Sequence, residues 1–381
     1  MFAPGHEVPD AYNLWRGFGC EARPGDCSLF LQHVHENVCG GVDEYYQYLM
    51  KWMARAVQYP DSPGQVAVVL RGKQGTGKSF LAKVFGDLWG RHFLQVSDPK
   101  HLVGNFNSHL RDCVVLFGDE AFYAGDKKHE SVLKTLITEE TITIEAKGVD
   151  AEAAPNFIHL MLASNSDWVV PAGAEERRFF VLDVGDARRR DSDFFRKVKG
   201  QLDDGGREAL LHHLMTMDLS DFDVRRVPET EALAEQKHHS LGPEEEWWFQ
   251  KLWEGRLMQD HIGWKCEVEK EELTADYVAH CQRFNITRRG NATRLGKFLS
   301  RVCPDGYPKS AQRYVERDVP TGDGWVRKKR VRPYFHVFPA LAECRRRWDE
   351  LYSTKTDWPQ EEEPQEELGE PTEDSEAAEP F

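Results

Sequence analysis

The sequence predicts an α/β core with a mainly parallel sheet, preceded by a helical N-terminal region and followed by a smaller α+β module. Three observations lead to this fold class. From Gln65 onward, short apolar strands alternate with helical segments, as in a parallel sheet covered by helices. The first strand runs into a glycine-rich loop and a helix. A strongly basic stretch follows a second boundary near "HHSLGPEEEW".

Five segments are expected along the chain. They are a helical region at 1–60, the α/β core at 61–187, a helical subdomain at 188–243, the α+β module at 244–358 and an acidic tail at 359–381. The first region is predicted to be helical because "VDEYYQYLMKWMARAVQ" places apolar residues at helical spacing. The tail is too acidic and too poor in apolar residues to fold, so it is expected to be disordered.

Five strands are expected in and beside the core. They are Val66–Leu70, Val114–Phe117, Thr141–Glu145, Phe157–Ala163 and Phe179–Val184. The apolar strands are typical of a sheet that is buried on both faces. The strand at Thr141 is expected to form a hairpin with the residues that follow it.

Charge is distributed unevenly along the 381 residues, whose formal net charge is −15. The tail from Pro359 to Phe381 holds ten acidic residues and no basic one. Between Tyr277 and Phe335 the chain instead has 14 Arg or Lys against 4 Asp or Glu. The global charge therefore argues neither for nor against nucleic acid, whereas the local excess favours it.

The cysteines and the apolar runs bear on the compartment. No apolar run approaches the roughly 18–20 residues of a membrane span, and the first residues lack the pattern of a secretory signal. Eight dispersed cysteines are then expected to be reduced thiols. Zinc between Cys20 and Cys39 is the alternative, which the absence of a CxxC pair disfavours.

The glycine-rich loop in "VAVVLRGKQGTGKSF" has the Walker A pattern. Its backbone N–H groups are expected to close around the phosphates of ATP. Lys78 is expected to reach the β- and γ-phosphates, and Ser79 to bind Mg²⁺. The predicted nucleotide-binding residues are Gly72, Gly75, Thr76, Gly77, Lys78 and Ser79. The core is therefore predicted to be a P-loop NTPase.

Polar residues follow two later strands. "CVVLFGDEAF" delivers Asp119 and Glu120 at the carboxyl end of a strand, where ligands of α/β proteins bind. Asp119 is expected to hold Mg²⁺, and Glu120 to deprotonate the attacking water, which makes the protein a hydrolase. "FIHLMLASN" ends in Asn165, which is expected to sense the γ-phosphate and place the water; an ordinary turn cap is the alternative.

An arginine pair, Arg177 and Arg178, precedes the last apolar strand. A guanidinium cannot lose its charge, so each arginine at the mouth of a buried strand needs a negative partner. A local salt bridge with Glu175 or Glu176 is one possibility, and a bound phosphate is the other.

Together these motifs resemble the superfamily-three helicases, which are AAA+-like. The resemblance rests on "GKQGTGKS", "VVLFGDE", "TIEAKG", "LMLASN" and "ERRFF", and it covers roughly residues 10–240. It is closest to the helicase portion of phage and plasmid primase–helicase proteins. Such proteins form hexameric rings that hydrolyse ATP and move along single-stranded DNA. The host-cell cytoplasm is then the expected location.

The resemblance also implies roles for two features. Arg178 would act in trans on the γ-phosphate of the neighbouring subunit, while Arg177 would face its own site in cis or pair with a nearby glutamate. The hairpin Thr141–Phe157 would project into the ring pore, where Lys147 would follow DNA phosphates. Asp150 and Glu152 depart from this pattern, because they bring negative charge near the same tip.

The basic stretch is predicted to be a winged-helix-like module that binds nucleic acid. "NATRLGKFLSRVC" places Arg294, Lys297 and Arg301 on one helical face. "SAQRYVERD" and "WVRKKRVRPYFHVF" then form two strands around a glycine turn, with Arg313, Arg327 and Lys329 among the available cations. A solvated charged surface is the alternative.

The function predicted from the sequence is that of an oligomeric, ATP-dependent DNA helicase of a phage-type replication system. Single-stranded or forked DNA and further copies of the chain are the expected partners. An ATP-switched initiator or loader without processive unwinding is the main alternative, and a packaging ATPase is a weaker one. The tail ends in Pro380 and Phe381, which could recruit a polymerase or a single-strand-binding protein; solubility is its simpler use.

Overall fold

The computed structural model describes residues 1–360 except residue 105, residues 122–126, residue 175, residues 287–289 and residues 321–324. The chain divides into two compact units, the first running from Met1 to Ser240 and the second beginning at Leu241. The acidic tail lies almost entirely outside the described residues, so its disorder and its contacts remain predictions.

A five-stranded parallel sheet forms the centre of the first unit. Its strands are, in spatial order, β2 (Phe93–Val96), β3 (Val115–Asp119), β6 (His159–Ser164), β1 (Ala67–Arg71) and β7 (Phe179–Asp183). The predicted α/β core with a parallel sheet is therefore confirmed. Four of these strands were predicted to within two residues at each end, and β2 was missed.

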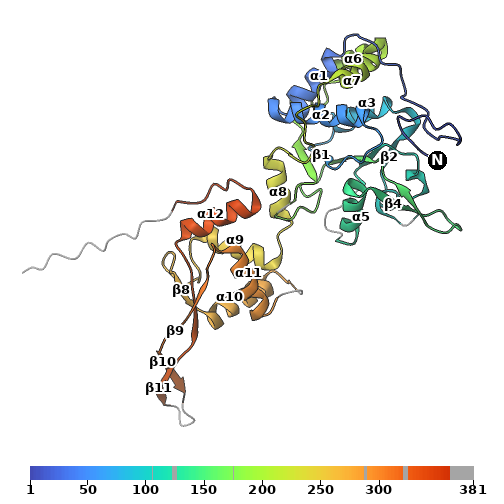
Figure 1. The fold of residues 1–381 in the computed structure, drawn as a ribbon. Coiled ribbons are helices and arrows are strands. Elements are labelled where there is room, and N and C mark those ends of the chain that lie inside the picture. The colour runs from blue at the N-terminus through green and yellow to red at the C-terminus, as the bar shows by residue number, and fades with distance from the viewer. Residues whose placement is uncertain (105, 122–126, 175, 287–289, 321–324, 361–381) are drawn as a thin grey trace, which may run out of the picture. The chain divides into compact units, whose positions relative to one another are not determined.

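Helices cover both faces of this sheet (Figure 1). One face carries α2 (Asp43–Gln58), α3 (Lys78–Asp87) and α7 (Arg207–Thr216), and the other carries α5 (Lys127–Thr138) and α8 (Glu231–His239). Along β1, Val68 and Leu70 lie in the first core, whereas Ala67 and Val69 lie in the second. Successive strand residues face opposite sides, so burial of both faces explains the unbroken apolar run of this strand.

The N-terminal region differs from its prediction. Helices begin only at Ser28, with α1 (Ser28–Gln32) and the π-helix η1 (His33–Val38) ahead of α2. Residues 1–27 contain no helix and are held by individual contacts. The Asn13 side chain donates to Ala3 O at 2.9 Å and accepts from Ala3 N at 3.0 Å. The prediction of a helical region from residue 1 was wrong, because contacts of this kind follow no helical period.

The other elements of the first unit are short. They are η2 (Gly90–His92), α4 (Pro99–Val103), η3 (Ser108–Leu110), β4 (Thr141–Ile144), β5 (Glu152–Pro155), α6 (Ser192–Gln201) and η4 (Leu202–Gly206). β4 and β5 pair antiparallel in a sheet of their own, so the predicted hairpin at Thr141 is present. α6 follows β7 and lies close to the loop that precedes α3, a position that becomes important at the site.

The second unit is an α+β arrangement. Its elements are α9 (Pro243–Glu254), β8 (Glu267–Glu269), α10 (Lys270–Arg283), α11 (Ala292–Val302), β9 (Lys309–Gln312), β10 (Val315–Pro320), β11 (Val326–Val331), β12 (Tyr334–Val337) and α12 (Leu341–Tyr352). β8, β12 and β9 form one antiparallel sheet, in that order. α11 buries Leu295, Phe298, Leu299 and Val302, as its apolar spacing predicted.

The basic strands form one long hairpin. β9 pairs with β12 from Lys309↔Val337 to Gln312↔Tyr334, and β10 pairs with β11 from Val315↔Val331 onward. Both ladders share one register, so the described residues 309–320 and 325–337 form one continuous strand pair, which we call the extended hairpin. Its outer strands extend away from the helices of this unit (Figure 1). The glycine turn predicted between the two strands, at residues 321–324, lies outside the described residues.

Candidate functional site

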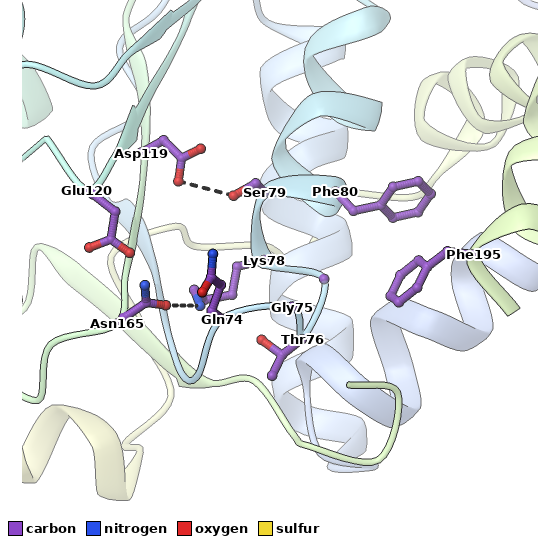
Figure 2. A pocket seen from close by; sticks show the side chains of 11 residues that line it. Gln74, Gly75, Thr76, Lys78, Ser79, Phe80, Asp119, Glu120, Asn165 and Phe195 are labelled. Carbon is purple, nitrogen blue, oxygen red and sulfur yellow. Dashed lines mark hydrogen bonds between the residues drawn. The ribbon is translucent and has the colours of Figure 1, made fainter. Parts of the chain in front are cut away.

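The loop between β1 and α3 has a conformation that glycine makes possible. Gly72, Gly75 and Gly77 have φ values of +147°, +83° and +99°, which side-chain-bearing residues rarely adopt. Within the described part of the chain, no acceptor is found for the backbone N–H groups of residues 74, 75 and 77–79, while the turn at 74–75 directs the N–H of Thr76 toward Lys73 O. These donors line a cavity of about 440 Å³ together with Asp119, Glu120, Asn165 and Phe195 (Figure 2). Unused N–H groups at the start of a helix form an anion-binding site.

Lys78 is buried inside this loop, with 6% of its surface exposed. Its Nζ donates to Gly72 O at 2.6 Å, to Lys73 O at 2.8 Å and to Asn165 Oδ1 at 2.8 Å. Burial lowers the pKa of Lys78, and the nearby carboxylates of Glu120 and Asp119 oppose this shift. The Lys78 ammonium group can exchange these hydrogen bonds for stronger, charge-assisted bonds to a phosphate.

Ser79 and Asp119 form a pair of oxygen ligands at one end of the cavity. Ser79 Oγ donates to Asp119 Oδ1 at 3.1 Å (Figure 2). Gln95 Nε2 donates to Asp119 Oδ2 at 3.0 Å. One hydroxyl and one carboxylate fit Mg²⁺, which takes few protein ligands and keeps water and substrate phosphates. No group of three or more His, Cys, Asp or Glu among the described residues could hold a metal, and the cysteines near η1 are free thiols.

Glu120 sits just beyond β3 in a strained conformation. Its φ is +57°, which is uncommon for a residue with a side chain, and its N–H donates to Ala163 O at 2.9 Å. Ser164 Oγ donates to Glu120 Oε2 at 3.2 Å. The carboxylate is therefore aimed by the neighbouring strand β6, beside Asn165 (Figure 2). Glu120, Asp119 and Asn165 all stand at the carboxyl edge of the sheet.

The π-helix η1 supports the loop from behind. Asn37 Nδ2 donates to Thr76 O at 2.7 Å, and Thr76 itself is fully buried. His33 is 1% exposed, and a Cβ on Gly77 would lie 2.5 Å from its ring. Burial lowers the pKa of His33 to about 4, so this ring is neutral at pH 7. Single-turn π-helices are frequent near functional sites.

The arginine pair lies at the amino ends of the strands, whereas the cavity lies at their carboxyl ends. Arg178 O accepts from Ala67 N, at the start of β1, whereas the loop follows Arg71 at its end. Four strand steps of about 3.3 Å separate these two ends by about 13 Å. Neither arginine lines the cavity. The expectation that Arg177 faces its own chain's site in cis was therefore wrong, because the arginines enter β7 rather than leave it.

The local salt bridge considered as the alternative is present for Arg178 and, among the residues that the structure describes, not found for Arg177. Arg178 Nη1 lies 3.3 Å from Glu176 Oε1, and the Glu176 side chain is only 4% exposed. The backbone N–H groups of Arg177 and Arg178 donate to the same carboxylate. Arg177 is exposed, and no ion pair for it is found in the described part of the chain. Glu175, the other expected partner, lies outside that part.

The candidate DNA contacts differ in their availability. Lys147 is exposed at the tip of the β4–β5 hairpin, where Glu152 pairs with Arg111. Arg294 pairs with Glu244 at 2.8 Å, Arg301 with Glu245 at 3.0 Å and Arg313 with Glu267 at 2.7 Å. Lys297, Arg327 and Lys329 are exposed, and no ion pairs are found for them among the described residues.

Several residues at the site were missed from the sequence. Gln95 comes from the missed strand β2, and Ser164 directly precedes Asn165 in "LASN". Phe80 and Phe195 line the cavity, and His33 and Asn37 brace its loop. Only Ser164 had a usable signal, since two consecutive polar residues ended a buried strand. Phe80 directly follows Ser79, and the remaining residues reach the loop from segments that are distant in the sequence.

Comparisons with known proteins place part of the chain near phage replication proteins. Residues 70–178 match a family described as "Family of unknown function (DUF5906)". A DNA primase-polymerase of Nitratiruptor phage NrS-1 is 30% identical over 137 residues, which is 35% of this chain and 19% of that protein. The chain thus matches about a fifth of the length of this curated relative.

Solved structures support the fold. The apo structure of the NrS-1 C terminal region has a TM-score of 0.63 and 16% sequence identity, covering 89% of this chain and 85% of that one. At this identity the likeness shows a shared fold. A JCV helicase structure aligns over 50% of this chain with a TM-score of 0.28, which is too low to support an argument. No helix in the described ranges is long and apolar enough to cross a membrane.

Proposed function

We propose that this chain binds ATP with Mg²⁺ in the cavity above the β1–α3 loop and hydrolyses it to drive a ring-forming motor on DNA. The observation that carries the nucleotide site is the set of unused N–H groups at residues 74, 75 and 77–79, which lie around a buried Lys78 beside Ser79 and Asp119. A triphosphate supplies the acceptors that these donors lack.

Each side chain has a role under this proposal. Lys78 leaves the carbonyls of Gly72 and Lys73 and binds the β- and γ-phosphates. Glu120, aimed by Ser164, removes a proton from the attacking water. Asn165, now bonded to Lys78, is released to the γ-phosphate or the water. Mg²⁺, held by Ser79 and Asp119, would neutralise charge on the phosphate oxygens.

A role in DNA replication is supported by the relatives. The matching curated protein is a phage DNA primase-polymerase, and its C terminal region shares this chain's fold at a TM-score of 0.63. The exposed cations of the second unit supply a surface for phosphates. We therefore propose a helicase of a phage-type replication system that works as a homo-oligomer on single-stranded or forked DNA.

The nucleotide site is tested with two substitutions. Lys78→Ala removes the phosphate contact and is expected to abolish both ATP binding and hydrolysis. Glu120→Gln removes only the base and is expected to abolish hydrolysis, lowering its rate by about 100-fold or more, while nucleotide binding remains. Filter binding and phosphate release measure the two steps. Equal loss of affinity in both variants would contradict these roles.

One observation favours a second candidate, an ATP-switched loader that does not unwind processively. The β4–β5 hairpin offers Lys147 next to the carboxylates of Asp150 and Glu152, which gives DNA a weak grip. Strand displacement on a forked duplex separates the two candidates. Continuous unwinding that Lys147→Ala slows, with unchanged ATPase in the absence of DNA, supports the helicase. ATP-dependent DNA binding without displacement supports the loader.

A further inference from the structure

Two aromatic rings line the cavity on the side away from the catalytic carboxylates. Phe80 follows Ser79 on α3, and Phe195 belongs to α6. Figure 2 shows both rings to one side of Lys78 and Ser79, with Asp119, Glu120 and Asn165 on the other side. Each ring is half-buried and contributes to the cavity surface. The proposed function assigns neither of them a role.

The two rings form a corner. Their centroids lie 5.2 Å apart, and their planes are inclined at 69°. His33 closes the back of this corner, with its ring centroid 5.2 Å from Phe195 and 5.8 Å from Phe80. Phe80 and Phe195, but not His33, line the cavity, so these two rings face the space that a ligand would enter.

The position of Phe195 is fixed relative to the phosphate loop. The segment between β7 and α6 follows the loop closely: Lys73 Nζ pairs with Asp186 at 2.7 Å, and Arg190 N donates to Gly75 O at 3.1 Å. Asp191 then caps α6 by accepting from Phe194 N at 3.0 Å. These contacts hold α6 and its Phe195 ring at a set distance from the anion site.

We infer that Phe80 and Phe195 form a subsite that stacks the base of a purine nucleoside triphosphate. This inference rests on the proposed nucleotide site. With the γ-phosphate beside Glu120 and the β-phosphate in the loop, the remaining nucleoside must leave the loop toward one end of the cavity. The aromatic corner occupies the end opposite the carboxylates, and a planar base gains from stacking on an aromatic ring.

The chemistry of the corner also sets its selectivity. Because the two rings are inclined at 69°, one of them can lie against the face of a base while the other contacts its edge, and every base has such a face. Adenine and guanine both present a large face, so ATP and GTP are expected to depend on Phe195 alike. The phosphates would supply affinity that is independent of the base.

The test separates the base from the phosphates in the full-length protein. ATP, GTP and inorganic tripolyphosphate, each with Mg²⁺, are titrated by calorimetry into wild type and Phe195→Ala. Stacking contributes about 1–3 kcal/mol per base, so affinity for both nucleotides should fall about 5- to 150-fold. Affinity for tripolyphosphate should stay within about twofold of wild type.

Phe194→Ala is the matched control, because Phe194 is the adjacent ring on α6, lies under Arg188 and does not line the cavity. It should leave all three affinities nearly unchanged, and Phe195→Trp should retain nucleotide binding. An equal loss for nucleotides and tripolyphosphate in Phe195→Ala overturns the inference, as does unchanged nucleotide affinity. Wild type that binds none of the three ligands overturns the proposed function itself.

Discussion

At the scale of single residues, Glu120 shows how a site can be shaped by conformation. Its φ of +57° carries a cost of about 1–3 kcal/mol that the surrounding structure must offset. The bond from its N–H to Ala163 O and the bond from Ser164 Oγ to its carboxylate hold it in place. The sequence predicted Glu120 from its position after an apolar strand, but backbone strain cannot be read from residue types.

Ser164 is therefore expected to act through Glu120. Ser164→Ala frees the carboxylate, and a hydrogen bond to a charged group contributes about 1.5–3 kcal/mol, so kcat for ATP hydrolysis should fall about tenfold or more. KM should change little, because Ser164 does not line the cavity. Steady-state kinetics with Ser166→Ala as control measures the effect. A similar fall in the control, or a change confined to KM, would contradict this role.

His159 links stability to pH. It is buried in β6, donates from Nδ1 to Phe157 O at 3.1 Å, and burial lowers its pKa to about 3. The unfolded chain takes up this proton near pH 6.5, whereas the folded chain resists it. The stability that His159 contributes is therefore complete above pH 6.5 and is lost as the pH falls toward the pKa of the folded state. At pH 5 this loss amounts to about 2 kcal/mol of unfolding free energy.

The measurement is urea unfolding at pH 7 and pH 5. His159→Gln should be less stable than wild type at pH 7 but should lose less stability between the two pH values. His239→Gln, at an exposed position on α8, should keep the wild-type difference. An unchanged pH dependence in His159→Gln would mean that other groups carry it.

At the scale of elements, the extended hairpin has two different faces. Opposite residues in an antiparallel pair point to the same side. One side of its outer strands pairs Arg317 with Lys329 and Val319 with Arg327. The other side pairs Glu316 with Arg330 and Asp318 with Lys328, so each acidic residue there lies opposite a basic one. We call these sides the basic face and the mixed face.

Only the basic face should follow DNA phosphates. Arg327→Gln with Lys329→Gln removes two positive charges from it, and Lys328→Gln with Arg330→Gln removes two from the mixed face. The first pair should flatten the log–log salt dependence of duplex binding by about two units, since each phosphate contact contributes about 0.9. The second pair should alter it much less. Fluorescence anisotropy between about 50 and 200 mM salt compares them, and equal changes would contradict a two-faced hairpin.

The elements also show which sequence patterns were informative. β1, β3, β6 and β7 were predicted because both of their faces are covered, which produces continuous apolar runs. β2 was missed because it lies at the edge of the sheet, and only Val96 of its four residues is buried. The basic helix face of α11 was predicted correctly, but its ion pairs with Glu244 and Glu245 depend on packing against α9.

At the scale of the whole molecule, the cavity lies at the carboxyl ends of the parallel strands and the arginine pair lies at their amino ends. A chain with both features intact therefore cannot join them by itself. Two copies packed head to tail, as in a ring, would bring the arginine pair of one to the cavity of the next. The family resemblance implied a role in trans for Arg178, and the strand order and register exclude the role in cis for Arg177.

A mixing experiment tests this arrangement. The double variant Arg177→Ala/Arg178→Ala and the variant Glu120→Gln should each be inactive as ATPases. If they assemble at random in equal amounts, about a quarter of the interfaces join an intact base to an intact arginine pair, so about a quarter of the wild-type rate should return. Native mass spectrometry confirms mixed assembly. Mixed rings without recovered hydrolysis would assign the arginines a structural role through Glu176.

Asn37 has a consequence for how forces travel through the protein. Its side chain holds Thr76 O at 2.7 Å, and its own carbonyl accepts from Gly185 N at 2.8 Å. One residue of η1 thus fastens the phosphate loop to the turn after β7. A displacement of η1, the segment before α2, would therefore also displace the phosphate loop, because the two Asn37 hydrogen bonds join them. Because coupling between two binding equilibria is reciprocal, a partner that binds this segment and changes the affinity of the loop for its ligand would have its own affinity changed by the same factor when the loop is occupied.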